Sequence, residues 1–101
     1  MMIDFTQMVT AEARDLAAKQ SRRVVMVCSR LQGRLTLGPE VCAQLDAMAD
    51  AKETPWAMRE IILNAGQWQR NSQTMDELAW LLGFDPDQMD RLFEAAMQVA
   101  V

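Results

Sequence analysis

Apolar residues recur every three to four positions along most of the chain, the spacing that places side chains on one face of an α-helix. Three prolines each follow a residue suited to the start of a helix, at Gly38-Pro39, Thr54-Pro55 and Asp85-Pro86. Proline is tolerated at the first helical position, because the amide proton that it lacks would have no partner there. We therefore expect an all-α fold, a compact bundle of four to five helices.

The first helix is expected to run from Ala11 to about Leu31, with Thr10 as its N-terminal cap. The residues before it are short and polar, so residues 1–9 are expected to form an extended N-terminal arm. Residues 10–101 would then form a single helical domain, which suits a chain of 101 residues.

A competing interpretation of the first helix starts from Val24-Val25-Met26-Val27-Cys28, a run that favours a β-strand. The alternating run Arg34-Leu35-Thr36-Leu37 follows it, and Gln32-Gly33 could form the turn between the two. The residues leave open whether 24–37 is helix or β-hairpin.

Four further helices follow from the same pattern. Their expected bounds are Pro39 to about Ala51, Pro55 to about Arg70, a short helix capped by Thr74 that ends at Leu82, and a last helix that opens at Pro86. The inner face of the third helix would consist of Met58, Ile61, Ile62, Ala65 and Trp68. Gly83 is expected to end the short helix in a left-handed conformation, and Asp85 to cap the last one.

Residues 75–93 carry the most specific local pattern. Ala79, then Gly83 four residues later, then Met89 after six more, is the spacing of a helix-turn-helix. The small alanine lets the second helix pack closely, and the glycine makes the tight turn. Taken alone, this corner predicts binding to DNA.

The charges of this region argue against nucleic acid as a partner. Residues 72–101 contain six acidic side chains and one arginine, a net charge of −5. The second helix of the corner would present mostly acidic groups outward, namely Asp85, Asp87, Gln88, Asp90 and Arg91. DNA binding depends on neutralising phosphates with lysine and arginine, so we favour a helix-turn-helix-like corner without that function. A small DNA-binding regulator stays as the alternative.

Charge also divides the chain along its length. Residues 1–34 contain six basic and three acidic side chains, whereas residues 35–101 contain four basic and eleven acidic ones. The two parts are electrically complementary, so they could attract each other within one molecule or between copies in a homo-oligomer.

Catalysis is not expected. The chain has no histidine, so neither a Ser-His-Asp nor a Cys-His arrangement can form, and it has no glycine-rich phosphate loop. Cys28 and Cys42 lie 14 residues apart without a CxxC motif, which makes zinc improbable and favours two small buried thiols. We expect no metal and no cofactor. No membrane span or secretory signal is recognisable, so a bacterial-type cytoplasm is the expected location.

Five residues are candidates for binding a partner. Trp56 and Trp80 fall off the expected core stripes, and tryptophan is enriched where interfaces gain most of their binding energy. The alternative is that both rings cover the ends of the core. In the arm, Ile3, Phe5 and Met8 would be anchors that become ordered on a partner.

Two stretches resemble a known group of proteins. The opening Ile3-Asp4-Phe5-Thr6-Gln7-Met8-Val9-Thr10-Ala11-Glu12 resembles the start of small proteins encoded among the tail genes of phages and prophages. The back half is also similar to short prophage proteins of that group, from Thr54-Pro55-Trp56-Ala57 through Trp68 and on to Leu81-Leu82-Gly83-Phe84 and Met89-Asp90-Arg91-Leu92-Phe93. The resemblance implies a tail-associated or tail-assembly accessory protein that binds other tail components without catalysis and could stay in the virion. An acidic inhibitor of a host protein is a further alternative in that context.

Overall fold

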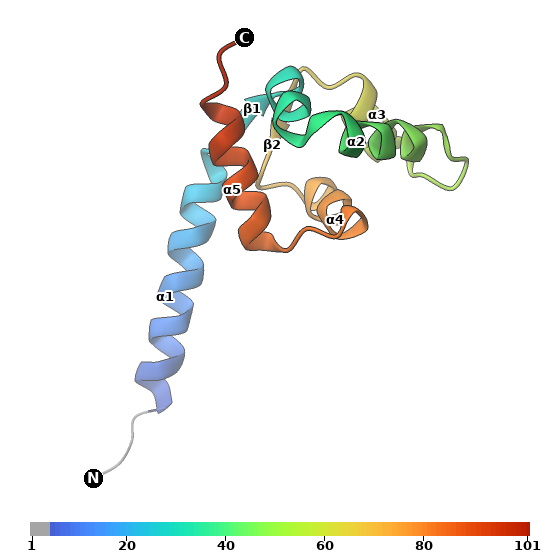
Figure 1. The fold of residues 1–101 in the computed structure, drawn as a ribbon. Coiled ribbons are helices and arrows are strands. Elements are labelled where there is room, and N and C mark those ends of the chain that lie inside the picture. The colour runs from blue at the N-terminus through green and yellow to red at the C-terminus, as the bar shows by residue number, and fades with distance from the viewer. Residues whose placement is uncertain (1–4) are drawn as a thin grey trace.

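The computed structural model describes the backbone of residues 5–101 and the side chains of residues 11–101 (Figure 1). The elements follow in the order α1 (Phe5–Val24), β1 (Val27–Ser29), α2 (Arg30–Asp50), α3 (Trp56–Leu63), β2 (Gln67–Gln69), α4 (Gln73–Leu82) and α5 (Pro86–Met97). The all-α expectation is confirmed, because five helices form most of the described chain and the single sheet has two strands of three residues each.

Helix α1 projects from a body formed by the other elements, which gives the molecule extents of 59 × 34 × 20 Å (Figure 1). It already begins at Phe5, so the extended arm expected over residues 1–9 is wrong from Phe5 onward, and Thr10 lies inside the helix rather than capping it. The segment contains neither proline nor glycine, so nothing in it stops a helix. Residues 1–4, among them Ile3, lie outside the described residues.

The first helix ends at Val24, and the strand β1 follows, so neither interpretation of residues 24–37 was right in full. The β-branched run does form a strand, but its partner is β2, about 40 residues later, in an antiparallel pair with Cys28 opposite Trp68. Residues 34–37 instead belong to α2. A strand so short needs a neighbour to supply its hydrogen bonds, and only the folded chain brings β2 to it.

Helix α2 consists of two helical pieces. Ser29 caps the first in a capping box with Gln32, and Gly38 separates the pieces with a φ of 86°. That backbone conformation favours glycine, which has no Cβ to clash. The second piece begins at Pro39 and runs to Asp50, so the expected helix from Pro39 to about Ala51 is confirmed.

The expected third helix is wrong beyond Leu63, because α3 ends there and Gln67–Gln69 form β2. Trp68 is buried as expected, but it reaches the core from a strand. Its Nε1 donates a hydrogen bond of 2.8 Å to the carbonyl oxygen of Ile61. Its ring lies so close to Gly33 that a Cβ on that glycine would overlap ring carbons Cε3 and Cζ3.

The corner between α4 and α5 has the expected helix-turn-helix form. Gly83 ends α4 with a φ of 84°, and Asp85 caps α5 in a capping box with Gln88. The start of α4 differs from expectation, since Ser72 rather than Thr74 is the cap and its hydroxyl accepts a hydrogen bond from the Met75 amide.

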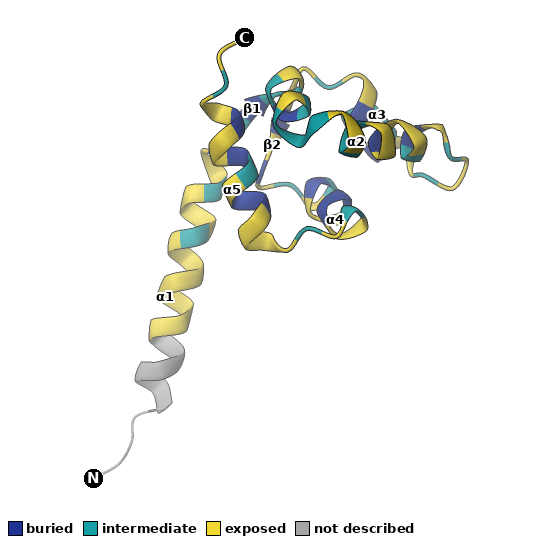
Figure 2. Ribbon diagram, viewed as in Figure 1, coloured by how far each residue is buried: buried dark blue, intermediate teal, exposed yellow. Residues whose placement is uncertain are grey.

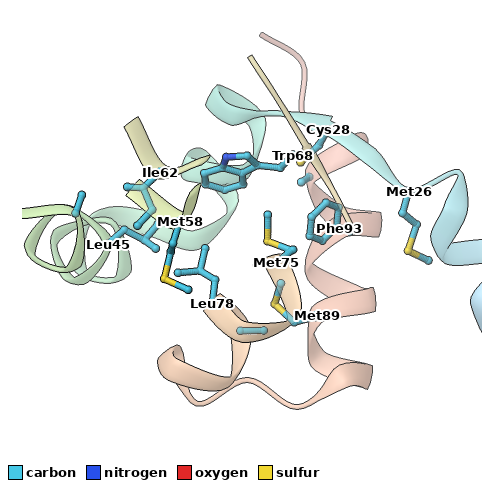
Figure 3. Packing of buried hydrophobic residues seen from close by; sticks show 13 residues of the cluster. Met26, Cys28, Leu45, Met58, Ile62, Trp68, Met75, Leu78, Met89 and Phe93 are labelled. Carbon is cyan, nitrogen blue, oxygen red and sulfur yellow. The ribbon is translucent and has the colours of Figure 1, made fainter. Parts of the chain in front are cut away.

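The core lies between α2, α3, α4, α5 and the sheet. Figure 3 shows the ring of Trp68 in the middle of the labelled side chains. The buried apolar side chains are Met26, Cys28, Leu45, Ala49, Met58, Ile62, Trp68, Met75, Leu78, Ala79, Met89, Phe93 and Ala96. None of them comes from the described part of α1, which is largely exposed (Figure 2).

Candidate protein-interaction site

A groove with an exposed tryptophan lies where α3 packs against α4. Trp80 is 78% exposed and Leu81 is 53% exposed, although both belong to a helix that packs on the core. The residues that line the groove are Pro55, Met58, Gln73, Asp76, Glu77, Trp80 and Leu81. The floor and walls are therefore largely apolar, and the charged side chains among these residues are both acidic.

The position of Trp80 follows from helix geometry. Met75, Leu78 and Ala79 form the buried face of α4, and one further residue turns the side chain about 100° around the helix. Trp80 therefore points away from the core, as its place off the expected stripe indicated. An indole of this kind offers about 150–250 Å² for burial against another molecule.

The structure describes the side chain of only one of the other predicted partner-binding residues. Trp56 is 73% exposed at the first position of α3, directly after Pro55, but it is not one of the groove residues. Phe5 and Met8 lie on the backbone of α1, and their side chains, like the whole of Ile3, fall outside the described residues.

Trp80 also lines a second hollow, next to a network of charged groups. Its lining residues are Arg23, Arg70, Asp76, Ala79, Trp80, Phe84, Pro86 and Met89. Trp80 and Asp76 line both hollows, so the apolar groove and the charged network share one part of α4.

Asp90 is the centre of the charged network. One carboxylate oxygen accepts from Arg23 Nε at 2.9 Å and from Arg70 Nε at 2.8 Å, and the other accepts from Arg23 Nη2 at 2.9 Å. Arg70 is only 2% exposed, and its Nη1 donates to Asp76 at 2.7 Å. Two guanidinium groups therefore face two carboxylates, so the charges balance.

The expectation that Asp90 points outward from α5 is wrong, since the residue is only 9% exposed. Burial disfavours its ionised form, but hydrogen bonds and charges from Arg23 and Arg70 outweigh burial and lower the pKa of Asp90 below its usual value. The hydrogen bond with Asp90 in turn raises the pKa of Arg23. Sequence spacing could not find this cluster, because its members lie 20 and 67 residues apart.

Ion pairs also connect α1 to α5, one helical turn apart. Arg23 binds Asp90, and Lys19 Nζ lies 3.5 Å from an oxygen of Asp87. The attraction that the charges allow between the basic beginning and the acidic end of the chain thus occurs within one molecule in these two pairs, while residues 11–18 of α1 are exposed to solvent. The remaining outward residues of α5, Asp87, Gln88, Arg91 and Glu94, are exposed.

The described residues show no set of three or more cysteine, aspartate or glutamate side chains placed to hold a metal ion. Burial raises the pKa of the Cys28 thiol, which keeps it protonated and unreactive. Both cysteines are free, and among the described helices none is long and apolar enough to cross a membrane.

No family model matches the chain, and neither a curated protein nor a solved structure matches it.

Proposed function

We propose that this protein is a non-enzymatic protein–protein interaction module whose groove beside Trp80 binds an apolar, basic segment of a partner protein. The exposed Trp80 ring, with Leu81 and Pro55 beside it, carries the proposal. Tryptophan contributes strongly to binding when a partner shields it from water, and a monomer gains nothing from leaving such a ring in solvent.

The acidic charge in and around the groove indicates which kind of segment would bind there. Asp76 is already paired with Arg70, but Glu77 on the same wall has no cation among the groove residues. The body that surrounds the groove is also acidic, since residues 35–101 carry a net charge of −7 from eleven acidic and four basic side chains. A segment with apolar side chains and a lysine or arginine therefore fits best.

The resemblance of Ile3–Glu12 to the opening of small phage tail proteins supports a tail component as the partner. In this proposal the protein is a tail-associated or tail-assembly accessory factor. It acts by contact alone, in the host cytoplasm, where tails are assembled.

Purified components encoded beside this gene provide the test. Each would be titrated with the wild-type protein by calorimetry, and with Trp80→Ala and Glu77→Lys variants. We expect one component to bind, with Trp80→Ala raising Kd about 30-fold, the effect of losing an interface hot spot of about 2 kcal/mol. Glu77→Lys should also weaken binding, because the occupant carries positive charge.

Leu35→Ala is the matched control, because Leu35 is an exposed apolar residue of α2 outside the groove and its replacement should leave Kd unchanged. Trp56→Ala in the same series reports whether the neighbouring tryptophan takes part. Binding that survives Trp80→Ala undiminished would refute the groove. Salt-sensitive retardation of duplex DNA by the protein alone would instead support the regulator alternative.

A further inference from the structure

Another hollow lies where the beginning of α2 meets the end of α3. Its lining includes Leu31 and Leu63, together with Arg30, Arg34 and Asp46, and we name it the α2 hollow. Both leucines are open to solvent, Leu31 at 56% and Leu63 at 43%. Its volume is about 510 Å³. Hollows of roughly 300–1,000 Å³ accommodate drug-sized groups, so a ring as large as an indole fits here.

One arginine of the α2 hollow has no carboxylate partner within its own chain. Arg34 is paired with Asp46 at 3.1 Å, but none of the ion pairs among the described residues includes Arg30. The backbone amide of Arg30 donates to the carbonyl oxygen of Gly66 at 3.1 Å. The backbone is therefore fixed at this point, while the charge of the Arg30 side chain is available to another molecule.

The Trp80 groove carries the matching charge. Glu77 on its wall accepts a hydrogen bond of 3.3 Å from the neutral Gln73, and none of the ion pairs among the described side chains includes it. Glu77 lies three residues before Trp80, which places both on the same side of α4. The groove thus presents an indole beside a carboxylate without a cation, and the α2 hollow presents leucines beside a guanidinium without an anion.

The proposed function requires an apolar, basic segment in the Trp80 groove, and Arg30-Leu31 is a segment of that kind. Resting on that proposed function, we infer that a second copy of this chain supplies it. Arg30 and Leu31 of one copy enter the Trp80 groove of the other, with Arg30 beside Glu77, and the Trp80 ring enters the α2 hollow. The complementary charges fix the register of the contact.

The position of the two surfaces makes this a contact between molecules. The groove includes Pro55 and Met58 at the start of α3, whereas the α2 hollow includes Ile62 and Leu63 at its end. Helix α3 has 8 residues, a length of about 12 Å, so no copy can place Trp80 in its own hollow. The contact joins two different surfaces of identical chains, and it covers exposed apolar side chains on both.

Sedimentation equilibrium of the full chain over a range of concentrations tests the contact. We expect reversible self-association, which Trp80→Ala should weaken at least about tenfold because it removes the ring from the hollow. Leu31→Glu should weaken it to a similar extent, because it places a carboxylate in the groove that already contains Glu77. Leu16→Glu is the matched control, since Leu16 is an exposed leucine of α1 outside both surfaces.

A mixing experiment tests whether the two surfaces bind each other. Trp80→Ala disrupts the groove but keeps the α2 hollow, whereas Leu31→Glu disrupts the hollow but keeps the groove. Each variant alone should stay monomeric at a concentration where an equal mixture of the two forms mixed pairs. Circular dichroism of each variant shows whether its helices still form, so a folding defect is distinguished from a lost contact.

A charge exchange tests the pairing of Arg30 with Glu77. Arg30→Glu places two carboxylates face to face and should weaken self-association about tenfold. Arg30→Glu combined with Glu77→Arg should restore it, because the pair is rebuilt with its charges reversed. Glutamate suits the first turn of a helix, so Arg30→Glu should leave α2 intact.

Three results would overturn the inference: a wild type that stays monomeric at every concentration, self-association that survives Trp80→Ala, or complementary variants that do not associate when mixed. A monomeric chain whose groove still binds a neighbouring gene product through Trp80 would refute the second copy and leave the proposed function standing. If neither self-association nor binding of such a product depends on Trp80, the inference and the proposed function both fail.

Discussion

Arg70 Nε lies 2.8 Å from Asp90 Oδ1, and this contact joins the segment after β2 to the first turns of α5 inside the protein. Asp90 also receives Arg23 from the end of α1, so one carboxylate holds together three parts of the chain. The arrangement makes α5 the centre of the charged network, as well as one wall of the core.

Replacing Asp90 should destabilise the fold strongly. Asp90→Asn leaves the largely buried Arg23 without its anionic partner and removes one of the two carboxylates that the buried Arg70 contacts, and breaking such a pair costs about 3–5 kcal/mol. Urea unfolding followed by circular dichroism measures the loss. Asp87→Asn, which removes an exposed partner of Lys19, is the control and should change the free energy of unfolding by less than about 1 kcal/mol. Equal stability of the two variants would contradict the central role of Asp90.

Acid should weaken the protein through the same carboxylate. The pKa of Asp90 is lowered in the folded state, so its contribution to stability is complete above its unfolded pKa and is lost as the pH falls through the folded value. The free energy of unfolding, measured in urea between about pH 6 and pH 2, should therefore decline with acidity. The decline should be shallower in Asp90→Asn. An identical pH profile in both proteins would show that Arg23 and Arg70 do not lower the pKa of Asp90.

Gly33 should tolerate no side chain. A Cβ there would overlap the buried ring of Trp68, and overpacking of this kind costs about 1–3 kcal/mol. Gly33→Ala should lower the midpoint of urea unfolding and shift the tryptophan fluorescence. Gly66→Ala is the matched control, because a Cβ at that position meets open space and the backbone needs no left-handed conformation. A stable Gly33→Ala protein would mean that Trp68 packs differently.

The cap of α4 can be assigned by two substitutions. The Ser72 hydroxyl accepts a hydrogen bond from the Met75 amide, so Ser72→Ala should cost about 1 kcal/mol. Thr74 already lies within the helix, and Thr74→Ala should be close to neutral or slightly stabilising, because alanine is the better helix former. Thermal unfolding of both variants distinguishes the two positions, and a larger loss from Thr74→Ala would restore the cap expected from the sequence.

Local signals account for the elements that the sequence predicted well. Pro39 and Pro86 opened helices as expected, Gly83 closed α4 in the left-handed conformation, and Asp85 capped α5. Each of these features depends on a few neighbouring residues and their backbone preferences, so no distant contact was needed. The exposed position of Trp80 was also predictable from the local sequence, because helical spacing alone places it off the buried face of α4.

The errors arose where the local pattern suited more than one structure. Gln67-Trp68-Gln69 alternates between exposed and buried residues in the strand, yet Trp68 also fits the helical spacing that starts at Met58. The sequence could not choose, because the hydrogen bonds of β2 come from β1. In the same way, nothing near Asp90 in the sequence reveals that Arg23 and Arg70 surround it.

By itself, the sequence determined that this protein is built from helices, where several of them begin and end, and that its last third carries a net negative charge. Periodicity, caps and charge are properties of neighbouring residues, which explains that success. Only the tertiary structure decided that β1 pairs with β2, that Asp90 lies inside between two arginines, and that α1 stands apart from the body. Those features depend on contacts between distant segments, and such contacts exist only once the core has brought the segments together.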